Sequence, residues 1–426
     1  MSDENKNVEN NQEENQNREG CNKKWWEKLL GLKPTYGLKK WLELNLTNVF
    51  YGIICILLFV SFTSFSLKTP ENTLNDIPEN GKFVEDCNAS KNYTSGGIFN
   101  VGNNRYLIVG CINILDRKYY TYPLPRKMVG LEFYDNQYKK ITKRSDNLLY
   151  FIIDAVQLNN GNIFIQTTDE TGKNYFAIID KNTFEINKVF SHEDLFKDQS
   201  SNIDWHFINL SKNKIVLING LQHSTYIFDA DNNTLKKAPE YNKEILDRTA
   251  IVPLDINRYI VFEGIPRYKK EHSLIEICDI NKNKCFTQKS KLYQSKTLPN
   301  LFKTNDNKIL IIGDKRNESN TIELFDPVND TIEIIGQLPN DKVFSRSYTQ
   351  LKDGNILITG GEKGIMVKEK VNDAYIFDVE KKELKRIKNG MKYARVRHLT
   401  GVLENGDVLI CGGRLGNARC ERYIYK

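Results

Sequence analysis

The chain lacks the features of nucleic-acid-binding, fibrous and polytopic membrane proteins. Its 61 Lys and Arg against 54 Asp and Glu leave a formal charge of only +7 over 426 residues. This small excess is spread along the chain, whereas phosphate binding needs concentrated cations. Only one stretch is apolar enough to cross a bilayer, which excludes a polytopic membrane protein. Twenty-six Gly, 11 Pro and an aromatic fraction of 11% exclude collagen-like, coiled-coil and wholly disordered chains.

Motifs of common enzyme and metal sites are also missing. The chain contains no GxxxxGK[ST], HExxH, GxSxG or CxxC pattern. The five histidines occur singly, at positions 192, 206, 223, 272 and 398. No clustered ligand set for copper or zinc can be assembled from them, so we expect no metal and no cofactor.

The N-terminal part predicts a membrane anchor. Residues 1–24 hold one aliphatic side chain after the initiator Met, Val8, and predict a disordered tail. Residues 25–43 mix tryptophans with lysines, as in an amphipathic segment on the inner leaflet. Residues 44–67 carry no charge and are long enough to span a hydrocarbon core of about 30 Å. Residues 68–81 form a linker to the remainder of the chain.

Charges beside this span predict its orientation. Six lysines and a single acid, Glu27, lie between Lys23 and Lys40, whereas acids dominate residues 68–87. The positive-inside rule therefore places the N-terminus in the cytoplasm and the C-terminal part outside the cell membrane. A cleaved signal peptide is the alternative. It is disfavoured because the apolar run exceeds a typical signal sequence and the cleavage pattern at Ser64-Phe65-Ser66 is weak.

A unit of roughly 50 residues recurs after Gly81 and predicts the fold. Its first half is a turn followed by an apolar strand, and these strands end at residues 110, 167, 219, 263, 313, 360 and 412. Its second half is a strand that ends in Asp, followed by a polar turn and another strand. The terminal residues of these strands are Asp135, Asp180, Asp229, Asp279, Asp326 and Asp378. Near-continuous apolar runs indicate strands covered on both faces.

Such units predict four-stranded blades packed radially over residues 82–426, an all-β propeller of seven blades, with six or eight as alternatives. The last unit ends at Lys426 after its third strand. We therefore expect residues 82–87 to supply its fourth strand and to close the ring.

Six cysteines, an even number, follow the predicted span, and this suits an oxidising compartment. Cys278 and Cys285 flank a polar turn between two strand ends, which predicts a disulfide between them. The closing strand suggests a Cys87–Cys420 bridge, which leaves Cys111 and Cys411 as the third pair.

The C-terminal units resemble kelch repeats, the repeats of galactose-oxidase-like propellers. The resemblance rests on Arg395, His398, a turn at Gly406 and an apolar strand that ends in Gly412-Gly413. A second doublet, Gly360-Gly361, is followed by Tyr375-Ile-Phe-Asp378. The resemblance covers roughly residues 340–426 well, and earlier units lack the doublet. It implies a kelch-like propeller, in which we expect the glycines to be structural, because they permit positive φ and close backbone approach.

The funnel of such a propeller predicts a binding rim made of interstrand loops. Cationic and aromatic residues suited to carboxylates, sugars or protein loops are the candidates. They are Trp205, Arg346, Tyr348, Arg395, Arg397, His398 and Arg414. We expect a platform for a protein or a carbohydrate ligand. A sugar-acid epimerase or mutarotase with Arg and His in the funnel, and a purely structural envelope component, are the alternatives.

Overall fold

The computed structural model describes the greater part of the C-terminal region. The described ranges are 81–89, 93–112, 129–137, 139–144, 151–169, 173–196, 205–219, 224–242, 249–262, 274–294, 296, 298–313, 319–339, 343–364, 368–414 and 418–425. The chain divides into two compact units, Met1–Asn72 and Thr73–Lys426, and every described residue belongs to the second. The predicted tail, juxtamembrane segment and span, and the linker up to residue 80, lie outside the described residues. Among the residues that are described, no helix has both the length and the apolar character to cross a membrane.

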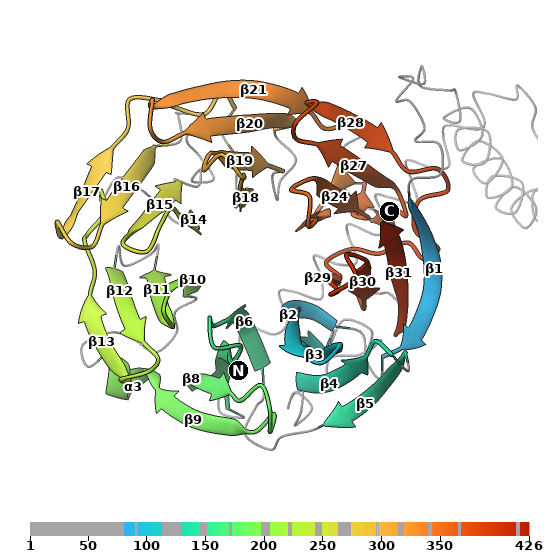
Figure 1. The fold of residues 1–426 in the computed structure, drawn as a ribbon, viewed down its shortest axis with the longest axis horizontal. Coiled ribbons are helices and arrows are strands. Elements are labelled where there is room, and N and C mark those ends of the chain that lie inside the picture. The colour runs from blue at the N-terminus through green and yellow to red at the C-terminus, as the bar shows by residue number, and fades with distance from the viewer. Residues whose placement is uncertain are drawn as a thin grey trace, which may run out of the picture. The chain divides into compact units, whose positions relative to one another are not determined.

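The described residues form seven four-stranded antiparallel sheets around a common axis, the arrangement of a β-propeller (Figure 1). Five sheets use four consecutive strands. The first holds β2 (Tyr93–Gly102), β3 (Arg105–Ile112), β4 (Val129–Asp135) and β5 (Lys140–Arg144); the second β6 (Phe151–Gln157), β7 (Ile163–Thr168), β8 (Asn174–Ile179) and β9 (Ile186–Ser191). The third holds β10 (His206–Ser211), β11 (Lys214–Asn219), β12 (Ser224–Asp229) and β13 (Thr234–Lys237); the fourth β14 (Ala250–Pro253), β15 (Arg258–Phe262), β16 (Ile275–Asp279) and β17 (Lys284–Thr287). The fifth holds β18 (Asn300–Lys303), β19 (Ile309–Ile312), β20 (Thr321–Asp326) and β21 (Thr331–Gln337).

The remaining two sheets are less regular. The sixth holds β23 (Ser347–Gln350), β24 (Ile356–Thr359), β27 (Ala374–Asp378) and β28 (Glu383–Arg386), and a small three-stranded sheet of β22 (Val343–Phe344), β25 (Glu362–Lys363) and β26 (Glu369–Lys370) accompanies it. The last sheet holds β29 (Leu399–Val402), β30 (Val408–Cys411), β31 (Arg419–Tyr425) and β1 (Gly81–Asn88). A short helix, α3 (His192–Leu195), follows β9.

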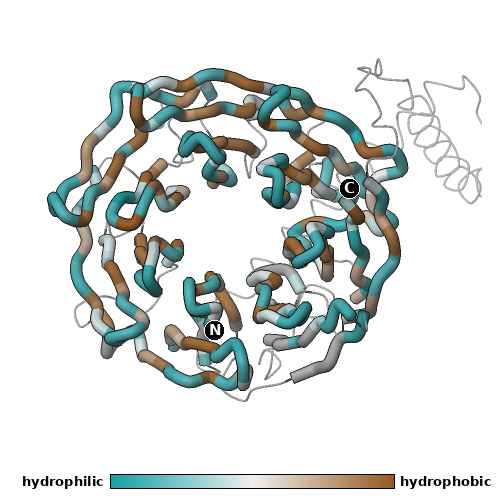
Figure 2. Tube along the Cα trace, viewed as in Figure 1, coloured by the Kyte–Doolittle hydropathy of each residue, from teal (hydrophilic) through white to brown (hydrophobic). Residues whose placement is uncertain are grey.

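Apolar side chains fill the spaces between neighbouring sheets. The described residues contain seven buried apolar clusters, one between each pair of adjacent sheets around the ring. Alternate residues of one strand enter different clusters: in β19, Ile309 and Ile311 face the fourth sheet, and Leu310 and Ile312 face the sixth. Each full burial of such a side chain stabilises the fold by roughly 1.5–3 kcal/mol. This two-sided burial explains the apolar runs in the sequence, which Figure 2 shows along the inner strands.

The polar turns that follow the third strands share one geometry. In the third sheet, the Asp229 carboxylate accepts hydrogen bonds from the backbone N–H groups of Asp231 and Asn232. Asp180, Asp279, Asp326 and Asp378 accept equivalent bonds. The residue four positions after each of these aspartates has a positive φ; these residues are Phe184, Asn233, Asn283, Asp330 and Lys382. Aspartate side chains therefore close these turns by accepting hydrogen bonds from the backbone that follows.

The first described strand closes the ring, as the sequence predicts. β1 pairs antiparallel with β31, from Gly81 opposite Tyr425 to Asn88 opposite Arg419. It forms the outer edge of the last sheet (Figure 1). A β-bulge interrupts the register between Glu85 and Asn88.

A buried ion pair holds this closing strand. The Arg422 Nε atom lies 2.8 Å from Asp86 Oδ2, and the two side chains are 9% and 0% exposed. The Tyr134 hydroxyl, from the first sheet, donates to Asp86 Oδ1 at 2.7 Å and also contacts the Arg422 guanidinium. The network therefore joins the two ends of the ring to the first sheet.

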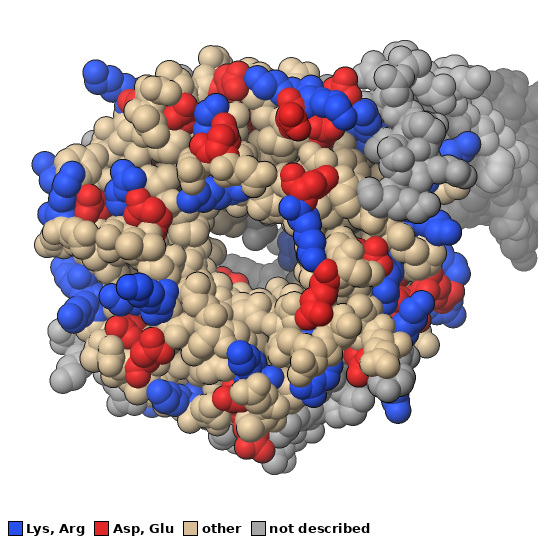
Figure 3. Space-filling view, in the orientation of Figure 1, with Lys and Arg blue, Asp and Glu red and all other residues tan. Residues whose placement is uncertain are grey.

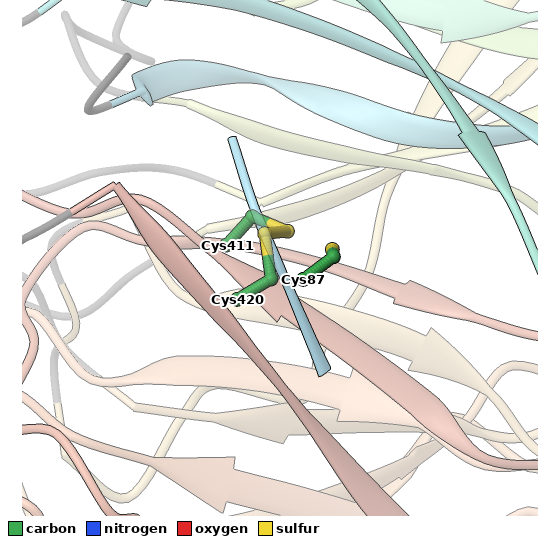
Figure 4. Close-up of side chains that lie close together, drawn as sticks. All are labelled: Cys87, Cys411 and Cys420. Carbon is green, nitrogen blue, oxygen red and sulfur yellow. A yellow bond between two sulfur atoms is a disulfide. The ribbon is translucent and has the colours of Figure 1, made fainter. Parts of the chain in front are cut away.

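Cysteine pairing agrees with the sequence in one case and departs from it in another. The predicted Cys278–Cys285 disulfide is confirmed, with the two residues opposite each other in β16 and β17. The predicted Cys87–Cys420 and Cys111–Cys411 pairs are wrong, because Cys411 is bonded to Cys420 (Figure 4). These two residues lie opposite each other on the adjacent strands β30 and β31, with Cα atoms 4.4 Å apart. Cys87 is a buried free thiol in the bulge of β1.

Replacing Arg422 with methionine is expected to lower the free energy of unfolding by about 3–5 kcal/mol, because Asp86 is left buried without its cation. Arg419→Met is the matched control on the same strand. Its partner Glu85 and Arg419 itself are 43% and 53% exposed, so the loss should stay below about 1 kcal/mol. Urea unfolding of the unit from Thr73 onward measures both. Equal losses in the two variants would contradict a special role for the buried pair.

Candidate binding surface

The two ends of the sheets differ in what they present. Short turns join first to second and third to fourth strands at one end, the turn end. The loops between second and third strands, and the segments that enter the next sheet, lie at the other end, the crossover end. All seven candidate residues belong to the crossover end. Six of them lie on the sixth and last sheets, and Trp205 precedes the third.

Arg395 is a buried residue that links neighbouring segments of the last sheet. Its side chain is 0% exposed. Its Nε donates to Glu421 Oε1 at 2.9 Å, and its terminal nitrogens donate to the carbonyl oxygens of Gly412 and Arg419 at 2.6 and 2.5 Å. The side chain thus ties the segment that enters the last sheet to both strands beside it. It does not belong to the solvent-facing rim where the sequence places it.

His398 is packed near Arg395. The residue is 5% exposed, and its Nε2 lies 2.8 Å from the Thr359 hydroxyl at the end of β24. Burial, with the Arg395 charge as a second cause, lowers the pKa of His398 to about 3. The imidazole is therefore neutral at physiological pH and acts as a hydrogen-bonding group of the core.

The glycine doublets provide room for the crossovers. A Cβ on Gly360 would lie 2.3 Å from the Arg395 carbonyl oxygen, and a Cβ on Gly412 would lie 2.4 Å from that of Tyr93. Both glycines have positive φ, 61° and 72°. Each doublet therefore accommodates the backbone that enters the next sheet, and the expectation that the doublets are structural is confirmed.

Three more candidates are packed to different degrees. Trp205 is 0% exposed and stacks on Phe196, with ring centroids 4.5 Å apart. Arg346 is 8% exposed, and its guanidinium lies 5.3 Å from the centre of the Tyr375 ring. Tyr348 is half-buried in β23 and packs against the cluster between the fifth and sixth sheets. Their aromatic and cationic groups contribute mainly to the interior of the crossover end.

Arg397 and Arg414 are the candidates that reach solvent. Arg397 is exposed and has a φ of 53°. Arg414 is half-buried, and its backbone N–H donates to the Val396 carbonyl at 2.8 Å, which holds the two arginine segments together. Within the described ranges, neither guanidinium forms an ion pair, and Arg414 Nε has no hydrogen-bond partner. A non-glycine residue held at positive φ is a mildly strained conformation of the kind that concentrates at functional sites.

Sequence reasoning missed a recurring buried glutamate in the third strands. Glu132, Glu276, Glu323 and Glu421 are all at most 2% exposed. Glu276, Glu323 and Glu421 accept the backbone N–H of Asn242, Tyr293 and Lys392, each in the segment that enters the same sheet, at 2.7–2.8 Å. The signal in the sequence for such a buried glutamate is its position between two apolar residues, as in Ile275-Glu-Ile and Ile322-Glu-Leu.

Sequence reasoning also missed Asp154, which lies in the innermost strand of the second sheet beside a β-bulge. Desolvation by the surrounding protein raises the pKa of Asp154 to about 7, and the backbone N–H of Ala155 partly offsets this effect. The signal in the sequence is a single acid within the apolar run Phe151-Ile-Ile-Asp-Ala-Val.

A polar groove of about 710 Å³ occupies the turn end beside the sixth sheet. Its cations are neutralised locally: Lys308 pairs with Asp306, Lys381 with Asp378 and Lys382 with Glu333. Charges of both signs also alternate over the face in Figure 3, around its central hollow. Five carboxylates and four lysines line the groove, so it offers a ligand little net charge.

The pKa of His398 predicts a pH effect on stability. Between about pH 6.5 and 3 the His398 imidazole binds a proton in the unfolded state and not in the folded state. The free energy of unfolding therefore falls as the pH falls. From pH 7.5 to 5, wild-type protein should lose about 2 kcal/mol more unfolding free energy than His398→Gln, which lacks this titration. Urea unfolding of both proteins at the two pH values measures the difference. Parallel losses would show that His398 titrates normally in the folded protein.

Comparison with known proteins supports the fold alone. No family model and no curated protein matches the sequence. Among solved structures, a fungal alcohol oxidase of the AA5 family in complex with copper is similar, with a TM-score of 0.61 and 11% identity over 82% of this chain and 77% of that chain. A streptogramin B lyase is similar with a TM-score of 0.55 and 12% identity, over 82% of this chain and 98% of that one. The chain therefore has a β-propeller fold that proteins of different activities share.

Proposed function

We propose that the protein is a seven-bladed, kelch-like propeller held by residues 44–67 to the cell membrane, with its N-terminus in the cytoplasm and its propeller outside. Seven sheets and seven apolar interfaces among the described residues support the blade number. The glycine doublets and the Arg395–His398 segment support the kelch character. Two disulfides suit a location in an oxidising compartment.

We infer that the propeller is a binding platform for a carboxylate-bearing protein or glycan, and that Arg397 and Arg414 are its primary contacts. The observation that carries this inference is the pair of arginines, joined through the Val396 carbonyl, without a carboxylate partner among the described residues. A guanidinium offers a planar fork of donors that matches a carboxylate. A ligand carboxylate would supply the missing partner.

Five other described cations at the crossover end of the same two sheets have acidic partners. The pairs are Lys363–Glu369, Lys368–Glu362, Lys392–Glu85, Arg386–Asp373 and Arg419–Glu85. Glu85 is shared by Lys392 and Arg419, so four carboxylates serve these five cations. Arg397 and Arg414 differ from these five cations in having no acidic partner among the described residues.

A binding role is better supported than catalysis in the funnel. An epimerase or mutarotase would need arginine, histidine and glutamate side chains that converge on an accessible pocket. At most 5% of Arg395, His398 and Glu421 is exposed, Arg395 donates to Glu421, and His398 bonds to Thr359 of the sixth sheet. Their groups are engaged in holding the last sheet together.

The double variant Arg397→Ala/Arg414→Ala tests the inference. We expect it to weaken binding of an acidic probe at least about tenfold, since each charge-assisted hydrogen bond contributes roughly 1.5–3 kcal/mol. Polyglutamate and polygalacturonate serve as the peptide and glycan probes, and neutral dextran as the uncharged one. Affinity is measured by biolayer interferometry at low and at physiological salt, where screening should weaken it.

Arg258→Ala/Lys282→Ala is the matched control, because it removes the same charge at the turn end of the fourth sheet, where Arg258 pairs with Asp255 and Lys282 lies near Asp279. It should leave the affinity unchanged. An equal loss in this control, or equally tight binding of dextran, would contradict a carboxylate site at Arg397 and Arg414.

A further inference from the structure

Three cysteines gather in the sheet that closes the ring. The sulfur atoms of Cys87, Cys411 and Cys420 all lie within 4.8 Å of one another, and all three residues are at most 8% exposed. Two of them form the disulfide between β30 and β31, and the third is the free thiol of β1 (Figure 4). A thiol and a disulfide that share one buried cluster have the parts needed for thiol–disulfide exchange.

The bulge in β1 accounts for this gathering. Between Glu85 and Asn88 the register shifts by one residue, so that Asp86 and Cys87 of β1 lie opposite Cys420 of β31. Asp86 reaches Arg422 and Tyr134, and Cys87 packs in the same cluster as Tyr134 and Cys420. Both side chains therefore turn toward the first sheet, an effect for which β-bulges are used. A regular strand would turn one of the two away.

We propose that the closing sheet carries an exchangeable disulfide latch, in which Cys87 displaces Cys411 as the disulfide partner of Cys420. The bond then joins β1 to β31 in place of β30 to β31. The Cys87 thiol loses its proton, and the thiolate attacks Cys420 Sγ. The Cys411–Cys420 bond breaks, and Cys411 leaves as a thiolate that takes up a proton. One disulfide and one thiol are present before and after, so no oxidant or reductant is consumed.

The two states differ greatly in what the bond encloses. The Cys411–Cys420 bond spans a sequence separation of 9 and staples one hairpin. A Cys87–Cys420 bond joins the first described strand to the last one and encloses the whole ring. Because chain-entropy stabilisation rises with the length of the closed loop, the second state resists opening of the ring more strongly. β1 is also the first strand after the proposed membrane anchor, so a pull on the anchor would act on the strand that the latch secures.

The surroundings of Cys87 keep the exchange slow while the sheet is closed. Burial, followed by the charge of the neighbouring Asp86 carboxylate, raises the pKa of the Cys87 thiol. The thiolate is the attacking species. Exchange therefore depends on alkaline pH or on a partial opening of the closing sheet.

Peptide mapping of the full-length protein tests the latch directly. Trypsin places the three cysteines on separate peptides, 83–91, 398–414 and 420–422, so each linkage has its own mass. Protein is held without added oxidant or reductant at pH 6 and at pH 8.5 in urea below the unfolding transition, then treated with N-ethylmaleimide before digestion. We expect the Cys87–Cys420 peptide pair to increase at least tenfold at pH 8.5, with Cys411 carrying the label.

Non-reducing electrophoresis gives a second readout, since a loop that encloses the ring makes the denatured chain more compact and faster. Cys87→Ser should abolish the fast band and retain the Cys411–Cys420 pair, and the Cys278–Cys285 pair serves as an internal standard. The proposal is overturned if Cys411–Cys420 remains the sole linkage of the cluster at every time while Cys87 carries all the label. Linkages that involve Cys278 or Cys285 would show general scrambling and would equally overturn it.

Discussion

The fold depends on one constraint: the last sheet gains its fourth strand, and the two ends of the ring are joined, only if the first described strand pairs with the last one. Here β1 pairs with β31, and the pairing is fixed by the buried Arg422–Asp86 ion pair and the Tyr134 hydroxyl. The pair matters less for its net energy than for what its loss would leave, which is a buried charge without a partner. It also favours this register, in which Val84 lies opposite Arg422 and Asp86 follows two residues later on the same face.

The other interfaces of the ring are held by interactions that repeat from sheet to sheet. Apolar residues of the second strands face the two neighbouring sheets alternately. Phe164 packs between the second and third sheets, whereas Ile163 and Ile165 pack between the first and second. Buried glutamates fix the incoming crossovers in three sheets, and in the last sheet Glu421 shares this role with Arg395. These buried contacts hold the crossover segments in place. Arg397 and Arg414 are therefore presented to solvent at fixed positions. A preorganised surface loses less conformational entropy on binding.

The periodic features of the structure could be predicted from the sequence, and the pairwise ones could not. Apolar second strands, Asp-terminated third strands and the glycine doublets repeat, so their spacing predicted the sheets and the closing strand. Cysteine pairing depends on the register of β30 against β31, which no pattern in the sequence marks and which places Cys411 opposite Cys420, where the sequence suggested Cys87. The solvent exposure of single residues could not be predicted, for a similar reason. Arg395 and Trp205 have the chemistry of a rim residue, but their 0% exposure follows from neighbours far away in the chain. The recurring Glu276 and Glu323 were overlooked because an acid within a strand suggests solvent rather than a buried backbone contact.

Hydrogen exchange of native protein tests the closure of the ring most directly. Amides of β1 and β31 are followed by mass spectrometry from the same sample, at neutral pH and without denaturant. Because β1 is an edge strand, only alternate amides of residues 82–85 point toward β31. The account predicts that these amides exchange as slowly as those of their partners at 421–424, since the two strands form one sheet and open together. Exchange of the β1 amides at the rate of an unstructured chain, while those of β31 remain protected, would show that the ring is not closed by its N-terminal strand.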